Sequence, residues 1–205
     1  MVNKVSMNET VLRILSLYNN NYLEKLHLRK IAVSLKITHR TISLHLERLR
    51  KLQVFKCELV GKSKQYFFNL CNPLVKKYIV AAENYASLDF LKKNALIRQI
   101  FLELDEKIIP ENGIILFGSY AKGYANSESD IDILVIGEIK SQDFIEKIET
   151  IYGRKISVKS ATLEEFSEAL KNKGILASEV LKGHIVLRHP SLFVEAAWRY
   201  YEKFT

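Results

Sequence analysis

Asp130 and Asp132 are separated by one isoleucine, at the start of the apolar run IDILVI. A β-strand points alternate side chains to the same face, so both carboxylates would project to one side and Ile131 and Ile133 to the other. Two like charges repel unless they are neutralised, and Mg²⁺ completed by phosphate oxygens and water does this. The pair therefore predicts a magnesium site for a displacement at phosphorus.

Gly118 and Ser119 lie between this run and an earlier apolar segment, residues 113–117, which we expect to be a buried strand. A glycine after a strand lets the backbone approach a phosphate closely, and amides at a helix start offer donors to an anion. A triphosphate is the ligand that this turn would hold. Lys122 would add positive charge near the phosphates, or else be a solvated helix lysine.

The complete spacing is more specific than any single element. It comprises Gly118-Ser119, then Gly123, then Ser129-Asp130-x-Asp132 and an apolar strand. This pattern resembles the polymerase-β-like nucleotidyltransferase superfamily, and the short segment 95–190 resembles its minimal nucleotidyltransferases. The resemblance implies transfer of a nucleoside monophosphate from an NTP to an acceptor hydroxyl, with Mg²⁺ on Asp130 and Asp132. Minimal nucleotidyltransferases resemble antitoxins that modify a helical partner toxin, so a protein acceptor is one expectation.

The sequence departs from that family at one position. Active members carry a third carboxylate on a neighbouring strand, where it binds metal and helps to deprotonate the acceptor. The corresponding strand here is residues 154–159, and Ser157 falls where the acid is expected. Glu164 or Glu165 could compensate, but the segment TLEEF looks like a helix start, where acidic residues meet the helix dipole without catalytic duty. Whether the transferase is active is left open.

Positive charge is concentrated in the N-terminal third of the chain. Residues 1–70 hold 13 Lys+Arg and 4 Asp+Glu, a net charge of +9, whereas residues 71–205 hold 18 and 19, a net charge of −1. Such a block is typical of a nucleic-acid-binding module, because binding to phosphates releases condensed counterions. A solubilising face is the alternative.

Helix and strand patterns in this block support a DNA-binding module. A helix pair is expected over LHLRKIAVSLKITHRTISLHLERLRKL, with Thr38 capping its second helix and Ile42, Leu46 and Leu49 facing the core. Two strand-like runs follow in VFKCELVGKSKQYFFNL, joined by a basic turn.

Residues 8–70 thereby resemble a winged helix-turn-helix domain. In that family the second helix of the pair lies in the major groove and the wing contacts the backbone or minor groove. The resemblance implies base or phosphate contacts by side chains expected to point outward: Arg40, Thr41, Ser43 and His45. It implies phosphate contacts by Arg48, Lys62 and Lys64. A winged helix used for protein contacts is the alternative.

The segment between the two modules contains neither Gly nor Pro from Leu74 to Glu106. Its apolar residues continue a helical stripe, with a break expected near Ser87-Leu88-Asp89. Such a linker packs on its own chain or pairs with a second copy, and a homodimer is favoured because winged-helix regulators read two half-sites.

Membrane and disulfide-stabilised secreted classes are excluded at this stage. The chain lacks both an apolar run of about 20 residues and a secretory signal, and Cys57 and Cys71 have no partner at metal-ligand spacing. We therefore expect a cytoplasmic protein without membrane partners.

These features predict an α+β protein with four parts. They are a winged helix-turn-helix (1–71), a linker helix or helices (72–106), a minimal nucleotidyltransferase domain with a mixed sheet (107–190) and a C-terminal helix (191–205). The predicted function is a DNA-binding protein whose second domain binds Mg-NTP and transfers a nucleoside monophosphate to a protein or nucleic-acid hydroxyl. The alternative is a transcriptional regulator whose inactive nucleotidyltransferase domain serves as a nucleotide sensor or docking module.

Overall fold

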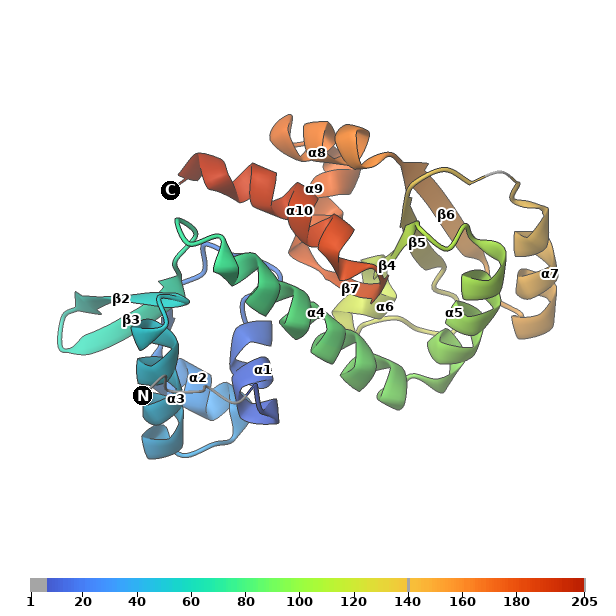
Figure 1. The fold of residues 1–205 in the computed structure, drawn as a ribbon. Helices are drawn as coiled ribbons and strands as arrows, with labels where there is room; N and C mark the ends of the chain where they lie inside the picture. The colour runs from blue at the N-terminus through green and yellow to red at the C-terminus, as the bar shows by residue number, and fades with distance from the viewer. Residues whose placement is uncertain (1–6, 140, 205) are drawn as a thin grey trace. The chain divides into compact units, whose positions relative to one another are not determined.

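The chain is divided into two units in the computed structural model, which describes residues 7–139 and 141–204. The first unit contains the described residues up to Tyr85 together with residues 201–204, and the second contains the described residues from 86 to 200. The outer limits of the predicted domains, at residues 1 and 205, lie outside the described residues. Figure 1 shows the elements of both units.

In the first unit, three helices precede a β-hairpin. Its elements are α1 (Glu9–Ser16), β1 (Leu26–His27), α2 (Leu28–Leu35), α3 (His39–Lys51), β2 (Phe55–Val60) and β3 (Ser63–Phe68). The hairpin turn is Gly61-Lys62, and β1 adds a third antiparallel strand on the far side of β3. Ser63 and Lys64, expected in the turn, are therefore the first residues of β3.

Local sequence explains where these helices begin. The Asn8 side chain accepts a hydrogen bond from the Val11 amide at 3.0 Å and caps α1. Thr38 caps α3, as predicted, because its hydroxyl accepts from the Thr41 amide at 3.3 Å. The predicted stripe of α3, Ile42 with Leu46 and Leu49, is fully buried.

An aromatic cluster fixes α1 and its following turn to the hairpin. The Tyr18 ring centroid lies 5.0 Å from that of Phe55 and 5.1 Å from that of Phe68. The Tyr18 hydroxyl donates to the Tyr66 carbonyl at 3.0 Å, so its polar end is satisfied inside the core. The hairpin is thus held on the helices by its inner face.

The predicted linker is two helices, α4 (Leu74–Lys93) and α5 (Ala95–Lys107). The break lies at Asn94 and not at Ser87-Leu88-Asp89, which continue α4. Asn94 leaves the helical conformation (φ −121°, ψ 79°), and its side-chain amide donates to the Phe90 carbonyl at 2.8 Å, closing the end of α4. An asparagine competes with helical backbone hydrogen bonding in this way, so it ends a helix without Gly or Pro.

Four strands form the sheet of the second unit, in the order β6-β5-β4-β7. Its elements after α5 are β4 (Gly113–Phe117), α6 (Gly118–Lys122), β5 (Ile131–Ile136), α7 (Asp143–Tyr152), β6 (Ile156–Ala161), α8 (Leu163–Lys171), α9 (Ile175–Lys182), β7 (His184–Arg188), α10 (Pro190–Tyr201) and the 3₁₀ turn η1 (Glu202–Phe204). Strand β5 runs parallel to β6, whereas β4 is antiparallel to β5 and β7. The predicted α+β class with a mixed sheet is confirmed.

Helices cover both faces of this sheet (Figure 1). On one face, Ile131 and Ile133 of β5 pack with buried residues of α5 and α7. On the other face, Phe166 of α8 stacks 6.2 Å from Phe193 of α10, which in turn lies 4.1 Å from the ring of His184 in β7. The alternation of β5 therefore sends Ile131 and Ile133 to the α5–α7 face and Asp132 to the α8–α10 face.

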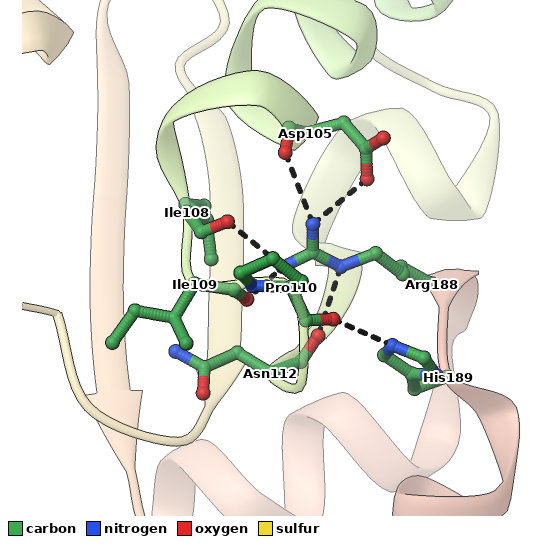
Figure 2. A network of polar contacts seen from close by, with 7 residues as sticks. All are labelled: Asp105, Ile108, Ile109, Pro110, Asn112, Arg188 and His189. Atoms are coloured by element: carbon green, nitrogen blue, oxygen red, sulfur yellow. Dashed lines mark hydrogen bonds and ion pairs between the residues drawn. The ribbon is translucent and has the colours of Figure 1, made fainter.

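Arg188 ties the end of α5 to the sheet, and Figure 2 shows its contacts. Its guanidinium donates to the Asp105 carboxylate at 2.9 Å, the Asn112 carbonyl at 2.9 Å and the Ile109 carbonyl at 2.6 Å. Helix α5 therefore belongs to the second unit, although the sequence placed most of it in the linker. The apolar stripe predicted for α5 is confirmed, since Ile97, Ile100 and Leu104 are buried. The Arg188 contacts at the end of this helix could not be predicted from the sequence.

No helix in the described part of the chain has the length and apolar character needed to cross a membrane.

Candidate functional site

The Gly118-Ser119 turn lies directly against Asp132. Gly118 has a positive φ of +70°, and a Cβ atom built on it would lie 2.2 Å from Oδ2 of Asp132. Only glycine adopts this conformation readily and leaves room for the carboxylate. The register explains the proximity, because Phe117, the last residue of β4, pairs with Asp132 in β5. The structure thus brings together two elements that the sequence identified separately.

Asp130 and Asp132 differ in their surroundings. Asp130 is exposed and precedes β5, which begins at Ile131 and not at Asp130 as expected, whereas Asp132 is half-buried inside the strand. Burial raises the pKa of Asp132, and the nearby carboxylates of Asp130 and Glu179 raise it further, while Lys122 and Lys159 oppose this effect. The two aspartates therefore repel each other, as expected of a pair that holds a cation.

Lys122 is anchored by contacts that the sequence did not predict. Its ammonium nitrogen lies 3.0 Å from Oε1 of Glu179 in α9. Its aliphatic stem crosses the backbone at Gly183, where a Cβ atom would lie 2.7 Å from Cγ of Lys122. The side chain is 27% exposed although the residue as a whole is exposed, so both interpretations of Lys122 stay predictions.

Ser157 occupies the position that the sequence assigned to it. It is the register partner of Asp132 across the parallel β5–β6 pair. Within the described residues, no group of three or more His, Cys, Asp or Glu side chains is arranged to hold a metal ion.

Glu165 has a structural role at the start of α8. Its carboxylate accepts from the Thr162 amide at 2.8 Å, and its own amide donates to the Thr162 hydroxyl at 3.1 Å, forming a capping box. The hydrogen bond from the Thr162 backbone lowers the pKa of Glu165. Glu164 is an exposed acid in the first turn of the same helix. The capping interpretation of TLEEF is confirmed for Glu165.

Most of the residues predicted to contact DNA are accessible in the first unit. Arg40, Arg48, Lys62 and Lys64 are exposed, whereas Thr41 and Ser43 are half-buried. The ammonium nitrogen of Lys64 lies 3.5 Å from Oε1 of Glu47. Four positions of α3 and two residues of the hairpin therefore remain candidates, and His45 is the exception.

His45 was expected to point outward, but it is 7% exposed. It follows Ile42 by three residues and precedes Leu49 by four, which places it on the buried stripe of α3. Burial lowers its pKa, and the Arg48 charge lowers it further. The outward prediction for His45 was wrong because the stripe was defined by apolar residues alone, and we withdraw it as a DNA contact.

A groove of about 680 Å³ runs between α2, the start of α3 and the hairpin. Its basic lining residues include Arg29 and Lys30 of α2, His39 of α3 and Lys64 of the hairpin. Only Lys64 was named from the sequence. The signal for Arg29 and Lys30 was available in LHLRK, which was interpreted only as part of the helix pair.

Comparisons with known proteins bear on the second unit. Residues 96–182 match the family model described as "Nucleotidyltransferase domain". A curated relative from Methanocaldococcus jannaschii, "Putative protein adenylyltransferase", is 46% identical over 65 residues, which are 30% of this chain and 60% of the relative. The chain thus matches about 60% of the length of that relative.

No solved structure matches the chain at a significant level. The predicted nucleotidyltransferase domain is nevertheless supported by the family model and by the relative, whereas the predicted winged helix has no counterpart in these comparisons. The family match begins at residue 96, inside α5, in agreement with the packing of that helix in the second unit. Residues 96–182 therefore match a nucleotidyltransferase domain, and the comparisons support nucleotidyl transfer in general.

Proposed function

We propose that the second unit binds Mg-NTP and transfers a nucleoside monophosphate to a hydroxyl group. The observation that carries this proposal is the close approach of the Gly118 turn to the Asp132 carboxylate. A phosphate held at the turn and a cation held by the aspartates would then be neighbours. The donor set fits Mg²⁺, which binds through one or two carboxylates and completes its shell with phosphate oxygens and water.

Each residue has a defined task in this proposal. Asp130 and Asp132 hold Mg²⁺, which supplies the positive charge that a triphosphate requires. The Ser119 hydroxyl and the backbone at Gly118 bind phosphate oxygens, and Lys122 contributes a fixed positive charge. The acceptor oxygen bonds to the α-phosphorus as the bond to the pyrophosphate oxygen breaks, and the acceptor proton leaves to solvent. Ser157 stands where the third carboxylate would be and has no carboxylate to take that proton.

We propose a protein hydroxyl as the acceptor and ATP as the donor. The support is the relative, whose printed description is a protein adenylyltransferase. A nucleic-acid hydroxyl is the other acceptor class. DNA binding by the first unit, which is proposed below, would favour this class because it would bring the domain to DNA.

A transfer assay tests the enzymatic proposal. Purified protein is incubated with Mg²⁺, α-labelled NTPs and cell extract, beside the Asp130→Asn/Asp132→Asn variant. We expect label on a protein or nucleic acid with the parent only. Tight nucleotide binding without transfer would contradict the enzyme and support the second candidate, a regulator whose domain senses nucleotide, which Ser157 favours.

We also propose that the first unit is a winged helix that binds double-stranded DNA. Its support is the order of helices and hairpin, the net charge of +9 over residues 1–70 and the basic groove beside Lys64. The candidate contacts are Arg40, Thr41, Ser43, Arg48, Lys62 and Lys64, with Arg29, Lys30 and His39 added from the groove. A homodimer on two half-sites, in the cytoplasm, completes this proposal.

Duplex DNA titrated at several salt concentrations tests this interface. Affinity should fall with salt, and Arg40→Ala or Lys62→Ala should weaken binding and flatten the salt dependence. Lys171→Ala, on α8 of the other unit, is the matched control. An affinity that changes neither with salt concentration nor in Arg40→Ala would contradict DNA binding by the first unit.

A further inference from the structure

The Lys122 side chain is held at two points outside its own helix. Its ammonium meets the Glu179 carboxylate of α9 at 3.0 Å, and its stem lies against Gly183, just after that helix. A side chain at Gly183 would displace the stem, since its Cβ would lie 2.7 Å from Cγ and 2.8 Å from Cε of Lys122. Glu179 of α9 and the backbone at Gly183 therefore restrict the conformation of the Lys122 side chain.

The ion pair is too exposed to matter much for folding. The Lys122 and Glu179 side chains are 27% and 44% exposed, and exposed pairs contribute little net stability because water and salt screen them. What the pair does fix is the direction of a long, flexible side chain. An unpaired lysine would sample many rotamers, and that freedom would be lost on binding an anion.

The fixed position lies beside the aspartate pair. Register places Asp132, Phe117 and His184 in one row across three strands, with their side chains on the α8–α10 face. His184 is tied to α9, because its Nδ1 lies 3.0 Å from the Val180 carbonyl. The Lys122 stem lies against Gly183, which directly precedes His184, and Glu179 directly precedes Val180. Helix α9 thus reaches the end of the sheet at which the acids lie.

We propose that Glu179 is a positioning residue that holds the Lys122 ammonium beside Asp130 and Asp132 as the fixed cation for the triphosphate. This inference rests on the proposed nucleotide site and deepens it. Glu179 does not replace the third carboxylate, since the described residues contain no three-acid metal cluster. Glu179 acts through Lys122, so the positive charge is needed at position 122 itself. An ion pair with the two charges exchanged would not replace it.

Binding of a fluorescent ATP analogue in the presence of Mg²⁺ tests the inference. Glu179→Ala should weaken binding roughly twofold to fivefold, the range expected for loss of an exposed ion pair. Glu168→Ala, which breaks the Lys171–Glu168 pair of α8 (3.3 Å), is the matched control and should leave binding unchanged.

The charge-swapped variant Lys122→Glu/Glu179→Lys separates positioning from structural support. We expect it to keep the melting temperature of the parent, because the pair contributes little to folding, without recovering nucleotide affinity. Recovery of both would overturn the inference, since a pair that only supports the fold works in either orientation. If the parent binds nucleotide and Glu179→Ala binds equally well, the inference alone fails, whereas a parent that binds none refutes the proposed nucleotide site itself.

A readout without nucleotide tests the geometry directly. Acetylation by an N-hydroxysuccinimide ester, followed by peptide mass spectrometry, measures the reactivity of each lysine. Lys122 should react several times faster in Glu179→Ala than in the parent, because its nitrogen is no longer held against the Glu179 carboxylate and is more accessible to the reagent. Equal rates would show that Glu179 does not hold Lys122.

Discussion

Substituting Gly118 by alanine perturbs the candidate site at its closest contact. The new Cβ would lie 2.2 Å from Oδ2 of Asp132. An ordinary contact begins near 3.4 Å, so the carboxylate must move by about 1.2 Å. The carboxylate is the free end of a side chain and can rotate away, but then it leaves the position next to the turn and Asp130.

Two effects of Gly118→Ala can be separated. The positive φ of +70° adds backbone strain of about 1–2 kcal/mol for an L-residue. Gly153 provides the matched control, since it has φ +60° and a Cβ there would meet nothing within 4 Å. Gly153→Ala should therefore carry the strain alone, lowering the melting temperature by roughly 5 °C.

The assay is Mg²⁺-dependent nucleotide binding by both variants, at a temperature where both are folded. Gly118→Ala should bind about tenfold more weakly than the parent, the usual scale for a misplaced metal ligand. Gly153→Ala should bind like the parent. Equal binding by Gly118→Ala and Gly153→Ala would refute the claim that the turn and Asp132 act as one site.

Three further predictions concern other parts of the molecule. Ser157→Asp places an acid opposite Asp132, so Mg²⁺ should raise its melting temperature more than that of the parent, whereas the exposed control Ser160→Asp should respond like the parent. Burial lowers the pKa of His45 below 6.5, so the stability of the first unit should fall as pH drops below about 6.5. In His45→Gln, thermal unfolding measured at acidic pH should show a smaller fall. Arg188→Met should cost about 3 kcal/mol in denaturant unfolding, because its buried carbonyl partners lose a charged donor, whereas the exposed-pair control Arg199→Met should cost under about 1 kcal/mol.

The sequence predicted what depends on local spacing. Thr38 caps its helix, Gly118 begins a turn after a buried strand, and Ser157 stands opposite Asp132. The first two follow from short motifs whose residues are close along the chain. The place of Ser157 and the mixed sheet were instead implied by the resemblance to nucleotidyltransferases.

Long-range polar contacts could not be predicted. The Lys122–Glu179 pair joins residues far apart in the chain, and so does the Arg188 network with Asp105. Charged residues on helix surfaces are common, and nothing in spacing marks which of them meet. The burial of His45 was missed for a different reason, since a polar residue on an apolar stripe was assigned by its chemistry and not by its position.

Calorimetric titration with MgATP tests the central claim most directly, because it reports binding whether or not transfer occurs. The parent should bind ATP in the presence of Mg²⁺ and lose most of that affinity with EDTA. Asp130→Asn/Asp132→Asn should show no metal-dependent binding while melting at the temperature of the parent or above it, since the repulsion between the acids is removed. Equal affinity of the parent and a folded variant, or binding by the parent that ignores Mg²⁺, would contradict a site built from the aspartate pair and the Gly118 turn.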